Sequence, residues 1–286
     1  MDLRRLRYFQ AVAEERHLTR AAERLGMRGT SLSQQILALE RDLGVDLFRR
    51  TPGGMVPTAA ALALLPRATV LLEAADQAAQ AARDAATGQR VLRIGVTPGS
   101  PPQIVPALWK AAKQLDVEPH FLDLPTSRQP DLIRACGLDL GIVVLPADAA
   151  GLETAPVGDA PLGVLVADSH PYARRRTLGL TDLEGQELLW FARELAPGYH
   201  DEVLAACRAA GWTPSRVRER DAREGLFAAE LRYERDLVAL RPAWSALDGT
   251  VWIPLTGKPL RVRHVLAHRD SDLVRDLLQE AFPLGP

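Results

Sequence analysis

Cysteine and lysine are scarce in this 286-residue sequence. Its two cysteines, Cys136 and Cys207, lie far apart and outside any CxxC pattern, which argues against a disulfide framework or a zinc site. We expect both to be small buried thiols. Lysine occurs only at positions 110, 113 and 258, so arginine supplies almost all the positive charge.

Long apolar runs are also lacking. No stretch approaches the roughly 18 uninterrupted apolar residues of a membrane span, and the first 15 residues have no apolar core after their basic residues. The sequence therefore indicates neither export nor membrane insertion, and it predicts a cytoplasmic protein. With 47% hydrophobic and 25% charged residues the chain should fold, and its length predicts two or three units.

Sequence motifs of common enzymes are missing as well. The chain contains no P-loop, no GxGxxG after a strand, no GxSxG and no HExxH, so we expect no catalysis and no cofactor. His264 and His268 are four residues apart, but the surrounding alternation predicts a strand. A strand would separate them by roughly 13 Å, too far for a shared metal ion.

Charge is distributed unevenly along the chain. The formal net charge is −1, yet residues 1–58 carry ten arginines against seven acidic residues, a local net of +3. The remainder must sum to about −4. Any nucleic-acid surface is therefore local to the N-terminal segment.

Apolar residues at helical spacing predict three short helices within about 45 residues. We expect Thr19 to cap the second helix, which ends at Gly26, and Thr30 or Ser31 to begin the third, which ends at Gly44. The apolar positions of the first and third helices are Leu3, Leu6, Phe9 and Ala13, and Leu32, Ile36, Leu39 and Leu43. The following LFRRTPGGMVPT predicts a hairpin, or wing.

The rest of the chain predicts a linker and a larger α/β region. Residues 59–87 form an expected dimerisation helix, residues 88–90 a hinge, and residues 91–286 an alternation of strands and helices typical of a parallel sheet. The seam of the linker helix would comprise Leu62, Leu65, Thr69 and Leu72. Strands are expected at 91–96, 118–124, 138–145, 161–167, 187–192 and 261–269, and helices at 104–115, 127–136 and 201–212.

The first 51 residues resemble the DNA-binding domain of LysR-type transcriptional regulators. Later pieces are also similar to that family: LRIGV from Leu92, LDLGIV from Leu138, and Ala196-Pro197-x-Tyr199 before a helix ending in AGWTP. The N-terminal hallmarks are Phe9, Val12, Ala13, Thr19-Arg20-Ala21-Ala22, Leu25, Leu32-Ser33, Gln35-Ile36, Leu39-Glu40, Leu43-Gly44, Leu47-Phe48 and Arg50-Thr51.

The resemblance implies a multidomain fold: a winged helix-turn-helix head at residues 1–58, a linker helix, and a two-lobed α/β effector domain shaped like a periplasmic-binding protein. It implies a sequence-specific regulator, controlled by a small molecule bound in the C-terminal cleft. The implied partners are double-stranded DNA with an inverted-repeat operator, a second copy in a homodimer or homotetramer, and RNA polymerase.

Candidate DNA-binding residues follow from the geometry of a helix-turn-helix, whose second helix enters the major groove. Short hydroxyls and an amide in its first turn can contact base edges or phosphates, and arginines nearby can bind phosphates. Each arginine alone is equally explained by a surface ion pair. The candidates are Thr19, Arg20, Arg28, Thr30, Ser31, Ser33, Gln34, Arg49, Arg50 and Thr51.

Candidate effector-binding residues begin with the loop Thr97-Pro98-Gly99-Ser100, between a strand and a helix. Free N–H groups at a helix start favour an anion such as a carboxylate, although Ser100 would also serve as a simple N-cap. In the family this loop lines the effector cleft. The resemblance places Thr126, Ser127, Phe191 and Tyr199 near the opposite walls.

The sequence departs from the family pattern in three places. Arg28-Gly29-Thr30 replaces the usual Ser-Gln-Pro or Ser-Gln-Ser, the wing Pro52–Met55 lacks a basic residue, and residues 228–244 lack a glycine-rich segment. A second hypothesis is therefore a degenerate head that serves a dimeric ligand-binding or partner-binding module. A solute-binding protein is a third, but it would need an export signal.

Overall fold

The computed structural model describes residues 2–87, 90–220, 224–234, 236–257 and 260–283. The chain divides into two compact units, residues 1–83 and 84–286, each with its own hydrophobic core. The expected hinge at 88–90 includes Gly88 and Gln89, which lie outside the described residues.

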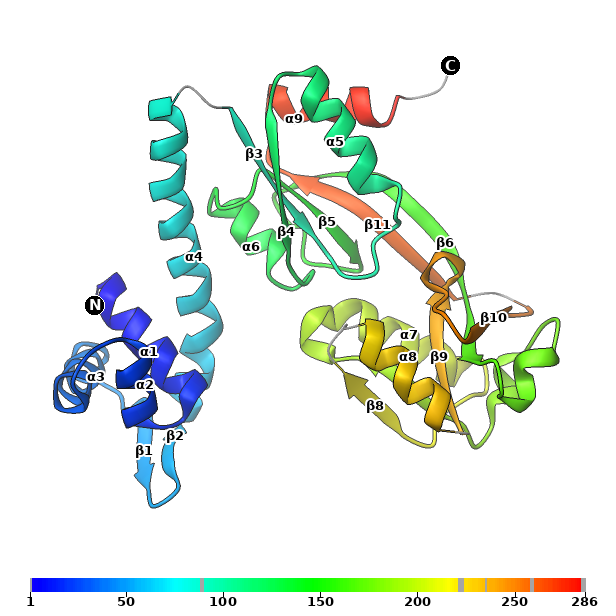
Figure 1. Cartoon of the computed structure of the whole chain (residues 1–286), viewed down its shortest axis with the longest axis horizontal. Coiled ribbons are helices and arrows are strands. Elements are labelled where there is room, and N and C mark those ends of the chain that lie inside the picture. The colour runs from blue at the N-terminus through cyan, green and yellow to red at the C-terminus, as the bar shows by residue number, and fades with distance from the viewer. Residues whose placement is uncertain (1, 88–89, 221–223, 235, 258–259, 284–286) are drawn as a thin grey trace. The chain divides into compact units, whose positions relative to one another are not determined.

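The N-terminal unit is a winged helix-turn-helix, as predicted. Its elements are α1 (Leu3–Glu15), α2 (Leu18–Arg24), α3 (Gly29–Leu43), the hairpin β1 (Phe48–Thr51) and β2 (Gly54–Pro57), and the long α4 (Ala59–Thr87). In Figure 1 the three short helices gather beside the start of α4, and the hairpin projects from them. The ring centroids of Phe9 and Phe48 lie 5.6 Å apart in the core that joins α1 to the wing.

The predicted helix starts were late by one or two residues. The last extended residues before α2 and α3 are His17 and Arg28, so these are the N-caps, and neither makes a side-chain capping bond. Thr19 therefore lies inside α2, and Thr30 and Ser31 inside α3. Gly44 ends α3 in the left-handed conformation at φ 69°, as expected of a glycine C-cap.

The apolar stripes are only partly buried. Leu3 is 46% exposed, so α1 packs through Leu6, Phe9 and Ala13. On α4, Leu72 is buried in the core of the head whereas Leu62 is 61% exposed, so the predicted seam does not form one free face. The reason is that α4 uses one side to pack on the head.

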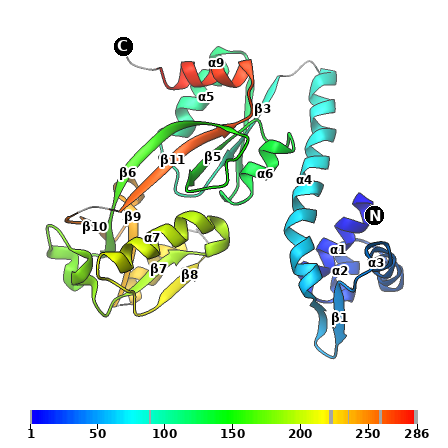
Figure 2. The ribbon, with the colours of Figure 1, turned by 180° about the vertical axis from the view of Figure 1, so that it is seen from behind.

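The first lobe of the C-terminal unit is built on three parallel strands, β3 (Val91–Val96), β4 (Glu118–Asp123) and β5 (Leu140–Leu145). Its helices are α5 (Ile104–Gln114), α6 (Gln129–Arg134) and α9 (Asp272–Ala281). Helices α5 and α9 pack side by side (Figure 2). Leu108, Leu266 and Leu277 join these helices to the sheet in one core.

The second lobe is built on the parallel strands β7 (Glu187–Phe191), β8 (Val217–Arg220) and β9 (Leu237–Pro242), with β10 (Thr250–Pro254) paired to β6. Its helices are α7 (Pro197–Ala209) and α8 (Glu224–Tyr233). Short 3₁₀ turns occupy Pro171–Arg174, Leu180–Leu183, Arg193–Leu195 and Ala243–Ser245.

Two long strands run through both lobes, β6 (Glu153–Ala167) and β11 (Arg261–His268) (Figure 2). Strand β11 is antiparallel to β5 and β6, and the second half of β6 is antiparallel to β9 and β10. The expected all-parallel sheet is therefore wrong: the sheet is mixed, because the chain returns from the second lobe and enters the first in the opposite direction. Strand β6 also begins eight residues before the predicted 161.

The cysteine prediction was half right. Cys207 is buried in the second lobe, whereas Cys136 is exposed after α6. Burial raises the pKa of the Cys207 thiol to about 12, so this thiol stays protonated at neutral pH.

Candidate DNA-binding surface and effector cavity

The core of the head fixes the orientation of α3. Leu32, Ile36 and Leu39 are buried, so the opposite side of the helix presents polar residues to solvent. Thr30, Ser31 and Gln34 are exposed in its first two turns, and Ser33 is half-buried beside them. This is the arrangement that a major-groove recognition helix requires.

The wing is attached to α3 through a carboxylate and a hydroxyl. The Glu40 side chain accepts hydrogen bonds from the backbone N–H groups of Leu47 (2.8 Å) and Phe48 (3.1 Å), where β1 begins. The Arg50 guanidinium donates to Oγ of Ser33. Arg49 and Thr51 are exposed on the same hairpin.

The arginines of the head fall into two groups. Arg5, Arg7 and Arg24 form ion pairs with Asp42, Asp76 and the Glu14–Glu15 pair. By contrast, Arg20, Arg28, Arg49 and Arg50 are exposed and, among the described residues, none of them lies within ion-pair distance of a carboxylate. The four predicted phosphate-binding arginines are thus the ones whose charge is not neutralised by a neighbour.

The predicted effector loop forms a tight turn at the end of β3. Pro98 and Gly99 (φ 82°) occupy its centre, and the Ser100 N–H donates to the Thr97 carbonyl at 3.2 Å, as in a type II turn. The Ser100 hydroxyl donates to the same carbonyl at 2.7 Å. Helix α5 starts only at Ile104, so Ser100 is not its N-cap and the loop does not place a ligand at a helix start.

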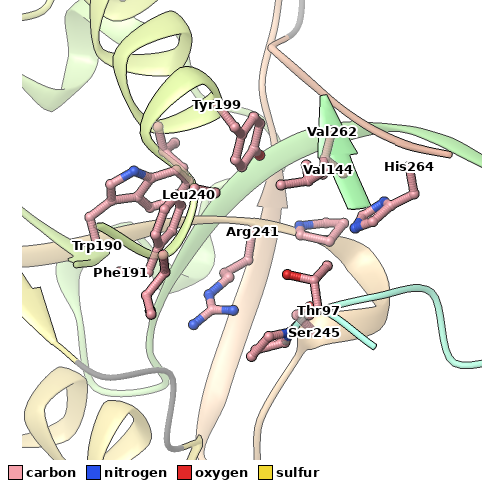
Figure 3. Close-up of a pocket in the computed structure, with 15 residues that line it drawn as sticks. Thr97, Val144, Trp190, Phe191, Tyr199, Leu240, Arg241, Ser245, Val262 and His264 are labelled. Carbon is pink, nitrogen blue, oxygen red and sulfur yellow. The ribbon is translucent and has the colours of Figure 1, made fainter. Parts of the chain in front are cut away.

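A cavity of about 70 Å³ opens beside this turn, between the two lobes (Figure 3). By the same measure one water molecule needs roughly 10–15 Å³, so the cavity holds a compact ligand. The lining includes the predicted Thr97, Pro98, Gly99, Phe191 and Tyr199. Further lining residues are Val144, Trp190, Leu195, Ala196, Leu240, Arg241, Pro242, Ser245, Val262 and His264.

Thr126 and Ser127 lie beside the cavity without lining it. The Thr126 hydroxyl donates to Oγ1 of Thr97 at 3.0 Å and accepts the Val144 N–H at 3.1 Å, so it supports the first-lobe wall. The Ser127 N–H donates to the Leu195 carbonyl at 3.0 Å and so joins the two lobes. Both residues line a neighbouring depression instead.

Aromatic rings form the second-lobe wall. Phe191 and Tyr199 stack with centroids 5.9 Å apart and planes 3° from parallel, and Trp190 lies 6.1 Å from Tyr199. Burial raises the pKa of the Tyr199 phenol, with Arg241 acting weakly in the opposite direction. The phenol is therefore neutral and contributes a hydroxyl and an apolar ring.

Sequence reasoning missed Arg241, His264 and Ser245. The signal for Arg241 was a charged residue inside the apolar run LVALRP, and that for His264 was a histidine on a strand that is otherwise apolar on one face. Both were present in the sequence, but only the sheet order brings β9 and β11 to the same cavity.

His264 provides a pH test of the cavity wall. It is 2% exposed, and burial lowers its pKa from 6.5 to about 4. The unfolded chain therefore binds more protons between these values, so stability is full above pH 6.5 and falls as pH decreases towards 4. At pH 5 the loss is about 2 kcal/mol. We expect His264→Gln to remove this component.

The measurement is urea unfolding at pH 7.5 and pH 5, followed by tryptophan fluorescence. All five tryptophans lie at or beyond position 109, so the signal reports the C-terminal unit alone. The control is His120→Gln at an exposed histidine, which should keep the pH dependence of the unaltered protein. An unchanged pH dependence in His264→Gln would contradict the assignment.

The described residues contain no group of three or more potential metal-ligating side chains. No helix in these residues is both long and apolar enough to cross a membrane. His264 and His268 lie on one strand, β11, as expected, and both are buried.

A winged helix-turn-helix joined to a two-lobed α/β domain with a cavity between its lobes defines a ligand-responsive transcriptional regulator. Two family models match the chain: the bacterial regulatory helix-turn-helix protein of the lysR family at residues 3–62, and the LysR substrate binding domain at residues 85–282. The chain belongs to the LysR family of transcriptional regulators.

Individual relatives agree with this assignment. The transcriptional regulator BudR of Raoultella terrigena is 30% identical over 277 residues, which cover 94% of this chain and 95% of BudR. The crystal structure of the LysR family regulator CbnR matches with a TM-score of 0.68 at 25% identity, over 98% of each chain. Full-length CbnR complexed with its target DNA matches with a TM-score of 0.63 at 25% identity, over 98% of this chain and 99% of CbnR.

Proposed function

We propose that the chain, without catalytic activity of its own, acts in the cytoplasm on an inverted-repeat operator. The first turns of α3 would contact base edges through Ser33 and Gln34, and the head's arginines would bind the flanking phosphates. The observation that carries the proposal is the group of exposed arginines, Arg20, Arg28, Arg49 and Arg50, that no described carboxylate neutralises.

The oligomeric part of the proposal rests on α4. Leu62 and Leu71 are 61% and 48% exposed on this helix, which is more apolar surface than a solvated helix needs. Pairing α4 between two copies would place two recognition helices on half-sites about 34 Å apart, or a multiple of that spacing. Two such dimers would join through the effector domains, and effector binding would change lobe closure and the regulator's contact with RNA polymerase.

Fluorescence anisotropy tests the DNA-binding proposal. The protein is titrated into labelled DNA from upstream of its own gene and into a scrambled duplex at several salt concentrations. We expect selective binding whose affinity falls steeply with salt, because bound arginines release counterions from the phosphates. Equally weak binding to both duplexes would contradict the proposal.

Gly29 is the observation that favours the degenerate-head alternative. A Cβ built at Gly29 meets nothing within 4 Å, so the fold of the head does not require glycine there. Gly29→Gln would restore the residue that the family commonly has in this turn. Under the alternative, the substitution should convert weak, unselective binding into selective binding, whereas under the proposal the unaltered protein is already selective.

A further inference from the structure

The cavity between the lobes contains a single permanent charge. Among the described residues that line it, Arg241 is positive and none is a carboxylate. His264 beside it is neutral at physiological pH, since burial lowers its pKa to about 4. An arginine in an otherwise apolar cavity favours an anionic partner, because a desolvated cation is costly without one.

Arg241 is held in place from several directions. Its backbone pairs with Gly163 across β9 and β6, and its carbonyl accepts the Trp252 indole N–H at 2.7 Å. The guanidinium carbon lies 4.2 Å from the ring centroid of Phe227. A side chain already positioned in this way loses little conformational freedom when a ligand binds.

The guanidinium also reaches the first lobe. A Cβ built on Gly99, in the turn after β3, would lie 3.8 Å from Nη1 of Arg241. In Figure 3 the Arg241 side chain extends between the aromatic wall and Thr97. An anion bound at this position would therefore contact both lobes.

The remaining walls select a flat apolar body. The parallel rings of Phe191 and Tyr199 present planar surfaces, and the cavity volume of about 70 Å³ restricts the ligand to a compact molecule. His264 lines the same cavity, is 2% exposed, and its Nδ1 has no hydrogen-bond partner among the described residues. Buried polar atoms are nearly always paired, so this nitrogen indicates a site that a ligand completes.

We propose that the effector is a compact aromatic monocarboxylate whose carboxylate pairs with Arg241 and whose ring lies against Phe191 and Tyr199. The inference rests on the proposed function of the cavity as the effector site. It replaces the turn at residues 97–100 with Arg241 as the group that recognises the anion.

Isothermal titration calorimetry with benzoate and benzamide tests the proposal, because the two probes share a shape and differ in charge. We expect the full-length protein to bind benzoate about tenfold or more tightly than benzamide, the usual gain of a charge-assisted hydrogen bond. Arg241→Met should bring the two affinities to within about twofold. Arg241→Lys should keep a preference for benzoate, which guards against a variant that merely misfolds.

The matched control is Arg263→Met, since Arg263 pairs with Glu202 on β11 and does not line this cavity. It should bind both probes as the unaltered protein does. Equal affinity for benzoate and benzamide, no heat from benzoate, or an unchanged preference in Arg241→Met would overturn the proposal. Selective operator binding measured in the same preparation would then leave the regulator function standing and remove only the ligand class.

Discussion

Substituting Arg49 and Arg50 together with glutamine is expected to weaken operator binding by about a hundredfold or more at moderate salt. Neither arginine is neutralised by a described carboxylate, and Arg50 is oriented by its hydrogen bond to Ser33 on the recognition helix. Each lost phosphate contact should also reduce the slope of log affinity against log salt by about 0.9. Fluorescence anisotropy across a salt series measures both quantities.

The matched control removes the same charge from elsewhere on the head. Arg7→Gln with Arg24→Gln also deletes two exposed cations, but these are paired with Asp76 and with Glu14 and Glu15. This variant should lose far less affinity and keep most of the salt slope. Equal losses in the two double variants would mean that net charge, and not contact by the wing, determines the affinity.

The head was predictable from sequence because its signals are local. The stripe through Leu32 and Ile36 identified α3, Gly44 gave its end, and the Pro-Gly-Gly segment gave the wing hairpin. Only the helix starts were misplaced. Capping depends on which residue has extended backbone, and the side-chain type at Thr19 or Thr30 does not determine that.

The effector domain was less predictable because its order is long-range. The first half of β6 has mostly exposed or half-buried residues and gave no apolar signal, so its pairing with β11 depends on tertiary structure. Elements β8, β9, β10, α8 and α9 were not predicted. Segment 228–244 was noted only as a departure from the family, and its Arg241 proved to line the cavity.

The predicted cavity residues divided for the same reason. Thr97 and Phe191 end strands that point to the cavity, and a resemblance carries such positions well. Ser127 follows the next strand but bonds across to Leu195, beyond the cavity rim. Gly198 lies close by: a Cβ there would be 2.5 Å from the Pro146 carbonyl oxygen, so the lobes approach too closely at this point for any side chain.

The wing provides a second large effect, at Gly54. This residue has φ 122°, a conformation that side chains rarely adopt, and a Cβ on it would lie 2.4 Å from the Arg16 carbonyl oxygen. That carbonyl accepts the Met55 N–H at 2.8 Å, the bond that holds β2 against the end of α1. Gly54→Ala must therefore distort the turn or break this contact, and we expect a loss of about 2–4 kcal/mol in the stability of the head.

Gly53→Ala is the control next to it in the chain. A Cβ at Gly53 has only Oγ1 of Thr51 within 4 Å, at 3.8 Å, and its backbone does not require glycine. Hydrogen exchange of the full-length protein, followed at residues 46–58, should show faster exchange in Gly54→Ala and little change in Gly53→Ala. Operator affinity should fall in the same order, because the wing carries Arg49 and Arg50. If both variants exchange alike, the attachment of the wing to α1 does not position these arginines, and their contribution to binding must come from the hairpin alone.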